Sequence, residues 1–425
     1  FYISEILTNF ALSKCLYNSA MNYVTHTLYN GLRVAMCQTD AKVAYIGVVV
    51  GSGSRDESSD RHGLAHFVEH TIFKGTWKRR SSAISARMES IGGELNASTS
   101  KENTIIYTTA PAGYADRAIE LLADIIANSL FPEHEVATEH EVVVEEIKSY
   151  LDTPSENVYD EYEERIFKGN ALAHNILGTP ESVRALTGHE CRQFLDLNYT
   201  PGNMVVYISA PDDPEKLIKR VEKHFGILNF PFRRPAREIP AELPQFDEVI
   251  DNDGFQAHTI FGARTFSRND PRRYALYLLN NYIGGPCMSS LLNNELREKR
   301  GLVYAVDSFN SLFSDAGLWS VYIGCDKSNV KKCLSIVKRE LDRLAQTSMT
   351  ERMLDKIKKQ YCGQLLVSSD NRENMAINMG KSLLFRDAIY DISHTAERIR
   401  AVTADELREV AELLVPSRCS RLTLL

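Results

Sequence analysis

The chain has 425 residues, of which 25% are charged, and its formal net charge is −7. This length exceeds one ordinary hydrophobic core, so we expect at least two domains. The acidic balance argues against nucleic acid as the main partner, and no apolar run reaches the length of a membrane span. The eight cysteines include no C-x-x-C pair, which is typical of reduced thiols rather than of a disulfide framework.

The first half of the chain mixes short strand patterns with helical patterns. Residues 1–20 precede them, and we expect this segment to be an extension or an artificial remnant outside the fold. Asn30-Gly31 predicts a tight hairpin, and Thr187 with Glu190 forms a capping box. The expected strands are 23–28, 32–37, 44–50, 94–99, 104–110 and 204–210. The expected helices are 63–73, 81–92, 114–129, 132–151, 155–167, one from 179 onward, 187–198 and 214–225.

A proline-rich stretch, residues 229–245, separates the two halves. It has no periodicity and is typical of an extended linker, so we expect domains at 21–228 and 246–425. The second half repeats the element order of the first, although its first helix carries neither His nor Glu. The expected strands are 257–264, 303–312, 317–324 and 420–425. The expected helices are 270–283, 288–300, 329–345, 351–367 and one that begins at Thr403.

The expected helix 63–73 carries the motif H-x-x-E-H. His66 and His70 are one helical turn apart, so both can bind the same ion, and Glu69 lies on the same face. Zinc hydrolases need two neutral imidazoles, a third ligand, water and a base, and this motif is the inverzincin signature. The simpler alternative is a surface helix that happens to carry two His and one Glu.

The third ligand is expected on the helix 132–151. Spacing alone leaves the choice open, although Glu146 with Glu139 on the same face is geometrically reasonable. A carboxylate behind a ligand can orient one of the histidines. The candidates are Glu139, Glu141, Glu145 and Glu146.

Four separated stretches resemble the M16 family of zinc peptidases, and most of all its M16B branch, which contains the mitochondrial processing peptidases and their bacterial homologues. The stretches are 63–73, 92–107 (GGELNASTSKENTIIY), 139–150 (EHEVVVEEIKSY) and 296–306 (LREKRGLVYAV). The resemblance implies an α+β fold of the LuxS/MPP-like metallohydrolase type. Two topologically similar domains, each an antiparallel-dominated sheet covered by helices, would form half of a clamshell.

The resemblance also implies residue roles. His66, His70 and Glu146 would bind one Zn²⁺ per chain, Glu69 would be the general base, and Glu139 would support a ligand. Asn96 and Ala97 would lie on an edge strand that pairs with the substrate backbone. Arg297 and Tyr304, in the second domain, would polarise the scissile carbonyl.

The function that these observations predict is a zinc metalloendopeptidase. It would cut extended peptides or unfolded protein segments inside the chamber of a homodimer whose active sites are shared between subunits. The alternative is a non-catalytic structural or regulatory subunit of the same fold, although such a subunit typically lacks a ligand or the base. We expect a bacterial cytoplasmic location, with the mitochondrial matrix, after removal of a targeting peptide, as the alternative.

Overall fold

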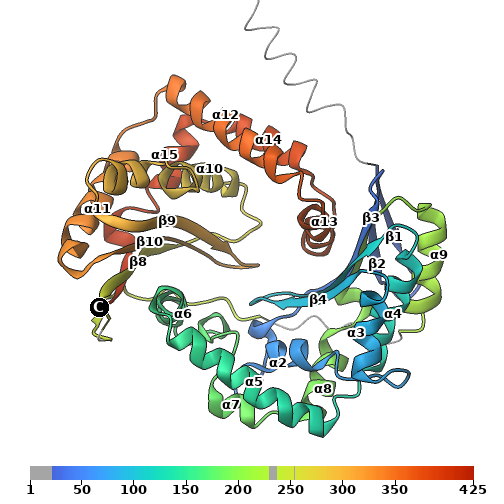
Figure 1. Ribbon diagram of the computed structural model, residues 1–425. Coiled ribbons are helices and arrows are strands. Elements are labelled where there is room, and N and C mark those ends of the chain that lie inside the picture. The colour runs from blue at the N-terminus through green and yellow to red at the C-terminus, as the bar shows by residue number, and fades with distance from the viewer. Residues whose placement is uncertain (1–21, 229–236, 253) are drawn as a thin grey trace, which may run out of the picture. The chain divides into compact units, whose positions relative to one another are not determined.

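The computed structural model describes residues 22–228, 237–252 and 254–425. Within these ranges the chain divides into two compact units, each with one β-sheet (Figure 1). Unit 1 comprises 22–141, 181–228 and 368–395, and unit 2 comprises 142–180, 237–367 and 396–425. The expected extension 1–20 and the first part of the expected linker, 229–236, lie outside the described residues. Residues 237–245 form neither helix nor strand.

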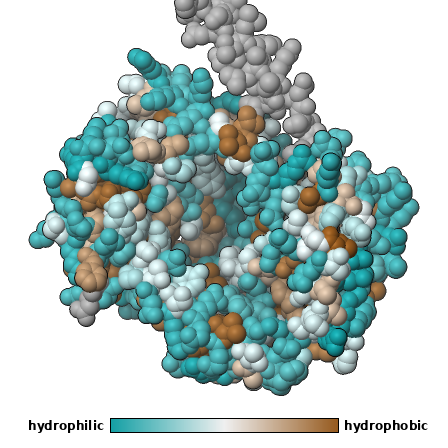
Figure 2. Space-filling model, in the orientation of Figure 1, coloured by the Kyte–Doolittle hydropathy of each residue, from teal (hydrophilic) through white to brown (hydrophobic). Residues whose placement is uncertain are grey.

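The face of the protein seen in Figure 2 is mostly hydrophilic, and the hydrophobic residues on it are scattered. Scattered exposed apolar residues are usual on globular proteins and need no partner to explain them. Within the described part of the chain, no helix has both the length and the apolarity that crossing a bilayer requires.

Unit 1 is built on a six-stranded sheet. Its strands are β1 (Tyr23–Thr27), β2 (Arg33–Gln38), β3 (Val43–Val50), β4 (Glu94–Thr99), β5 (Thr104–Pro111) and β6 (Met204–Ala210). Their order is β1-β2-β6-β3-β5-β4, with β2 and β6 parallel and every other pair antiparallel. Gly31 turns the chain between β1 and β2 at a φ of +88°, which glycine tolerates best. Strand β4 pairs with β5 alone and therefore forms one edge of the sheet.

Helices lie on both faces of this sheet and beside it. They are α2 (Leu64–Thr71), α3 (Ser81–Glu89), α4 (Ala115–Asn128), α5 (Glu133–Leu151), α7 (Pro180–Arg184), α8 (Gly188–Asn198), α9 (Pro214–Phe225) and α13 (Arg372–Arg386). Helices α4 and α9 lie on one face and α13 on the other (Figure 1). Met379 and Leu383 of α13 pack on Val205 and Tyr207 of β6. Helix α13 can approach so closely because Gly380 has no Cβ, which would lie 2.8 Å from Cδ1 of Tyr207.

Unit 2 contains a five-stranded sheet with the order β7-β11-β8-β10-β9. Its strands are β7 (Asp247–Ile250), β8 (Gln256–Thr265), β9 (Val303–Leu312), β10 (Gly317–Asp326) and β11 (Ser420–Leu424). Its helices are α6 (Pro154–Ile166), α10 (Arg273–Gly284), α11 (Val330–Gln346), α12 (Glu351–Ser368), α14 (Ile392–Ala401), α15 (Ala404–Ala411) and the π-helical turn η4 (Asn293–Glu298). The 3₁₀ turns of the two units are η1 (Ser54–Asp56), η2 (Ala171–Ala173), η3 (Pro201–Asn203), η5 (Lys327–Asn329) and η6 (Pro416–Arg418).

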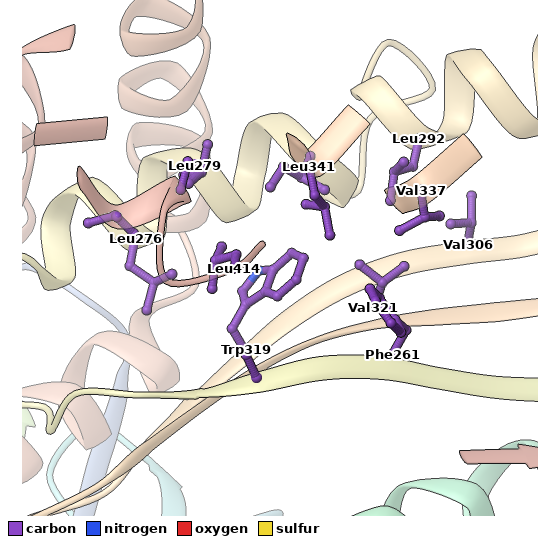
Figure 3. Close-up of a cluster of buried hydrophobic side chains, with 14 of the residues drawn as sticks. Phe261, Leu276, Leu279, Leu292, Val306, Trp319, Val321, Val337, Leu341 and Leu414 are labelled. Carbon is purple, nitrogen blue, oxygen red and sulfur yellow. The ribbon is translucent and has the colours of Figure 1, made fainter. Parts of the chain in front are cut away.

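The main core of unit 2 lies between its sheet and helices α10, α11 and α15. Trp319 of β10 is fully buried there with Leu276 and Leu414 around it (Figure 3). Its indole N–H donates to Oδ1 of Asn280 at 2.9 Å, so the polar atom of the ring is satisfied. The opposite face of the sheet is covered by α6, whose Tyr162 donates its hydroxyl to a backbone carbonyl of β8.

The fold class expected from the sequence is confirmed: each unit has an antiparallel-dominated sheet covered by helices. The compact units, however, are not continuous in sequence. Helix α6 comes from the first half of the chain and covers the sheet of unit 2, whereas α13 comes from the second half and covers the sheet of unit 1. In these two segments the units differ from the expected division into 21–228 and 246–425.

Three elements, β7, α13 and α14, were not expected from the sequence, and one expected element has another form. Residues 288–300 were expected to be an α-helix, but the structure has a π-helical turn, η4, over Asn293–Glu298. The amide of Lys299 donates to the carbonyl of Asn294, five residues back, and the amide of Leu302 donates to Leu296. Such π turns are uncommon and are frequent at functional sites.

Candidate metal centre

Helix α2 carries the H-x-x-E-H motif and is fixed at its start by the carboxyl group of Glu57. Gly63 precedes it with a φ of +90°, and Glu57 accepts hydrogen bonds from the amides of Gly63 at 2.9 Å and Ala65 at 2.7 Å. Burial raises the pKa of Glu57 to about 8, so its carboxyl group is largely protonated at neutral pH and caps the helix through these two hydrogen bonds rather than through its charge. One turn further, the buried Phe67 stacks on His140 of α5, with ring centroids 5.1 Å apart. The Phe67–His140 contact holds α2 against α5.

The side chains of His66, His70 and Glu146 converge. One ligand atom from each lies within 4.8 Å of the other two, and within the described residues these three form the sole such group of His, Cys, Asp or Glu. The division between the two units falls inside α5, after Glu141, so Glu146 is carried by the same continuous helix that packs on α2 through His140.

The chemistry of these three side chains fits a zinc ion. His66 is buried, and this burial, with the neighbouring His70, lowers the pKa of His66 to about 3. The imidazole is therefore neutral at physiological pH, as a metal ligand must be. Two imidazoles and one carboxylate are donors that Zn²⁺ prefers, and they leave one position of a tetrahedron open.

Glu139 and Lys74 fix the orientation of His70. One oxygen of Glu139 lies 3.2 Å from Nδ1 of His70, and the other forms an ion pair with Lys74. When Nδ1 of His70 carries the ring hydrogen, it donates a hydrogen bond to Glu139, which leaves Nε2 for an ion. Glu139 itself is buried, so Lys74 provides the positive charge that such a carboxylate needs.

The two other acidic candidates of α5 lie elsewhere. Glu141 forms an ion pair with Arg184 at 3.1 Å, and Glu145 forms one with Lys148 at 2.6 Å. Both of these carboxylates are exposed. Spacing left four glutamates open, and the structure brings Glu146 to the histidine pair and Glu139 to the back of His70.

Glu69 and strand β4 complete this region of unit 1. Glu69 is half-buried on α2, and α2 contacts β4. Asn96 and Ala97 lie opposite Tyr107 and Ile106 of β5, with Asn96 exposed and Ala97 half-buried. The far side of β4 pairs with no other strand in the described part of the chain, so its backbone can accept an added strand.

Arg297 and Tyr304 both lie in unit 2. Arg297 is exposed in the π-helical turn η4, and Tyr304 is 42% exposed near the start of β9. The hydroxyl of Tyr304 lies 3.4 Å from Nδ1 of the buried His258, an unusual neighbour for a residue on an edge strand.

Sequence reasoning missed two residues of this region, Lys74 and Glu57. Lys74 pairs with a carboxylate on a distant helix, and Glu57 caps α2 from a loop, outside any local capping pattern. Neither contact leaves a periodic or short-range signal, so the sequence alone offered no means to find them.

Comparisons with known proteins agree with this arrangement. Residues 33–180 match the family model "Insulinase (Peptidase family M16)", and residues 185–361 match "Peptidase M16 inactive domain". The chain is 35% identical to an uncharacterized zinc protease of Streptomyces coelicolor over 93% of this chain and 87% of that protein. It is 31% identical to the uncharacterized zinc protease YmxG of Bacillus subtilis, over 92% of this chain and 95% of that protein.

Solved structures show the same fold. A protease from Helicobacter pylori superimposes with a TM-score of 0.86 at 22% identity, over 95% of this chain and 100% of that one. A Pseudomonas fluorescens structure titled as a peptidase M16 inactive domain gives a TM-score of 0.87 at 18% identity, over 95% of this chain and 98% of that one. By its two family models and its relatives over most of its length, the chain belongs to the peptidase M16 family.

Proposed function

We propose that this protein is a zinc-dependent endopeptidase. The observation that carries the proposal is the convergence of His66, His70 and Glu146 within 4.8 Å, beside Glu69 on the same helix as the two histidines. The names of the relatives, zinc proteases, support the same chemistry.

The proposed roles follow from the donor atoms present. His66, His70 and Glu146 would hold the ion. A bound zinc ion acts as a Lewis acid and lowers the pKa of the water that it binds. Glu69 would accept a proton from the attacking water and return it to the departing amine nitrogen. Glu139 and Lys74 would keep His70 in its ligating orientation.

The substrate we propose is an extended chain. Edge strand β4, with Asn96 exposed and Ala97 half-buried on it, would pair with the backbone of a peptide and so bind it with little dependence on sequence. Tyr304 and Arg297 would donate hydrogen bonds to the carbonyl oxygen as negative charge develops on it.

We propose further that the protein works as a homodimer with a chamber and with active sites shared between subunits. The support is that one chain carries both the histidine cluster, in its first half, and the Arg297–Tyr304 pair, in its second. In a two-fold dimer, the metal-binding residues of each subunit can be combined with Arg297 and Tyr304 of the other, which gives two identical sites. The cytoplasmic location expected from the sequence stays a prediction.

The test combines metal analysis with cleavage. Purified protein should contain about one zinc per chain by emission spectroscopy, the number that a single three-ligand site can hold. It should cut a quenched peptide, lose this activity with a chelator and regain it with zinc. Zinc at this level without any cleavage across a peptide library would instead favour a non-catalytic M16 subunit.

A further inference from the structure

The position of Tyr304 on β9 depends on a shift in strand register. On β10, Gly324 lies opposite Ala305 of β9, but the next residue, Cys325, lies opposite Val303. Tyr304 is therefore one extra residue in β9, as in a β-bulge, and bulges change the direction of side chains near active sites.

The register shift decides which face of the sheet receives Tyr304. Val303 and Val306 both belong to the core under α10 and α11, whereas Ala305 packs with the core under α6. Regular alternation from Val306 would place Tyr304 in the core under α10 and α11. The extra residue turns it to the α6 face, where Tyr322 of β10 also lies.

On that face three polar side chains meet. The Tyr322 hydroxyl lies 2.9 Å from Nδ1 of His258, and the Tyr304 hydroxyl lies 3.4 Å from the same nitrogen. His258 is buried on β8, and Tyr159 of α6 stacks on Tyr322 with ring centroids 5.5 Å apart. His258 and Tyr322 are thus held by the sheet and by α6, while Tyr304 is still 42% exposed.

The backbone of β10 makes room for the Tyr304 ring. A Cβ on Gly324 would lie 2.5 Å from Cζ of Tyr304, so the ring rests directly on a residue without a side chain. A close approach of this kind requires glycine at position 324. The ring is thereby confined between the sheet and solvent, with its hydroxyl at the His258–Tyr322 pair.

We infer that His258 and Tyr322 are positioning residues that aim the hydroxyl hydrogen of Tyr304 outward, toward a substrate carbonyl. In this arrangement Nδ1–H of His258 donates to the Tyr322 oxygen, and the Tyr322 hydroxyl donates to the Tyr304 oxygen. The oxygen of Tyr304 is then engaged on its inner side, and its own hydrogen is left to donate. The inference rests on the proposed peptidase function, because that function gives Tyr304 a carbonyl to polarise.

The electrostatics of the group agree with this direction of donation. Burial lowers the pKa of His258, so the ring is neutral and carries a single N–H. Burial and then the hydrogen bond to Tyr304 raise the pKa of Tyr322, as expected when Tyr322 is the donor.

Two substitutions of His258 distinguish the hydrogen bond made by Nδ1 from the space that the side chain fills. In His258→Asn the side-chain amide can occupy the place of Nδ1, whereas in His258→Gln the amide reaches the place of Nε2. We expect His258→Asn to keep kcat within about threefold of wild type. His258→Gln and Tyr322→Phe should each lower kcat about tenfold with little change in KM, the effect of one misdirected hydrogen bond.

Double variants test whether the effect passes through Tyr304. Tyr304→Phe should lower kcat about a hundredfold, and adding His258→Gln or Tyr322→Phe to it should cost nothing further. Thr259→Val is the matched control. Thr259 lies next to His258 on β8, and the substitution removes a buried hydroxyl that contacts Thr423 of β11. It should leave kcat and KM unchanged. If His258→Gln or Tyr322→Phe lowers kcat by the same factor in Tyr304→Phe as in the wild type, the inference is overturned.

A second readout does not require peptidase activity. The hydrogen bond to the Tyr304 oxygen can be followed by the Cζ chemical shift of Tyr304 in protein with ¹³C-labelled tyrosine, with Tyr304→Phe identifying its resonance. Loss of the hydrogen bond donated by Tyr322 should change this chemical shift in Tyr322→Phe and in His258→Gln, but not in Thr259→Val. An unchanged Cζ chemical shift in both variants would overturn the inference. A wild-type protein that cuts no peptide but shows these shifts would refute the proposed function and leave the hydrogen-bond chain established.

Discussion

Glu139 contacts Nδ1 of His70 at 3.2 Å, and its second carboxylate oxygen forms an ion pair with Lys74. The metal-binding histidine proposed here is thus oriented by a buried carboxylate that is itself held by a lysine four positions beyond His70. Lys74 lies after the end of α2, so the contact depends on how α2 and α5 pack rather than on helical spacing.

Lys74→Met should therefore weaken zinc binding. The substitution keeps the length of the side chain but leaves Glu139 buried without its cation, so the carboxylate loses its fixed position. We expect an affinity lower by roughly tenfold, measured by competition with a chromogenic chelator. Lys78→Met is the control, because Lys78 forms its ion pair with Asp124, at 3.7 Å, in the same unit. Equal affinities in the two variants would show that Glu139 needs no help from Lys74.

The elements that the sequence predicted well are those whose signals are local. The hairpin at Gly31, the capping box of Thr187 and Glu190, and the histidine spacing of α2 each depend on residues within one turn of one another. Long-range pairing is different. The glutamate helix was expected, but which of its carboxylates reaches the histidines depends on the packing of Phe67 against His140.

The exchange of helices between the units has the same explanation. An amphipathic helix shows which of its faces is buried, not which sheet buries it. Helix α6 has a regular pattern that predicted its existence, but its assignment to the sheet of unit 2 depends on long-range contacts such as those of Tyr162 with Gly262 and of Tyr159 with Tyr322. The register shift at Tyr304 is likewise invisible in a strand pattern, because it is defined by the partner strand β10.

Glu146→Gln should lower zinc affinity by roughly tenfold or more and abolish activity, because a neutral amide replaces the single anionic donor of the three. Glu145→Gln is the matched control on the neighbouring residue, whose carboxylate pairs with Lys148 at 2.6 Å and faces solvent. It should keep both zinc and activity. If Glu145→Gln loses the metal and Glu146→Gln keeps it, the proposed ligand is wrong.

Glu69→Gln should retain zinc and fold but lose turnover. The amide cannot accept the proton of the attacking water, and a general base contributes roughly two to four orders of magnitude. Zinc content, circular dichroism and cleavage of a quenched peptide measure the three properties separately. Turnover close to wild type would remove Glu69 from the mechanism.

The form of the substrate provides another test. Because strand pairing with β4 requires an extended backbone, a disordered peptide should be cut, whereas the same sequence inside a tightly folded domain should resist. A disulfide-stabilised domain can be compared before and after reduction, with cleavage sites mapped by mass spectrometry. Efficient cutting of the oxidised, folded form would contradict binding at an edge strand.

The proposed sharing of active sites between subunits can be tested by complementation. Glu69→Gln and Arg297→Ala should each be nearly inactive alone, since one lacks the base and the other a carbonyl-polarising group. If Arg297 acts on the site of the partner subunit, a mixed dimer regains one complete site. The Arg297→Ala subunit provides Glu69 and the histidines, and its partner provides Arg297.

Random exchange makes about half of the dimers mixed, and each mixed dimer has one good site of two, so activity should rise to roughly a quarter of wild type. Subunit exchange is verified first by native mass spectrometry of differently tagged chains. Mixing Glu69→Gln with the double variant Glu69→Gln/Arg297→Ala is the control, because no pairing of these chains contains Glu69. If Arg297 acts within its own chain, every site in the first mixture lacks one group and mixing restores nothing. No recovery after demonstrated exchange would therefore refute the shared site and favour an enzyme whose chains act independently.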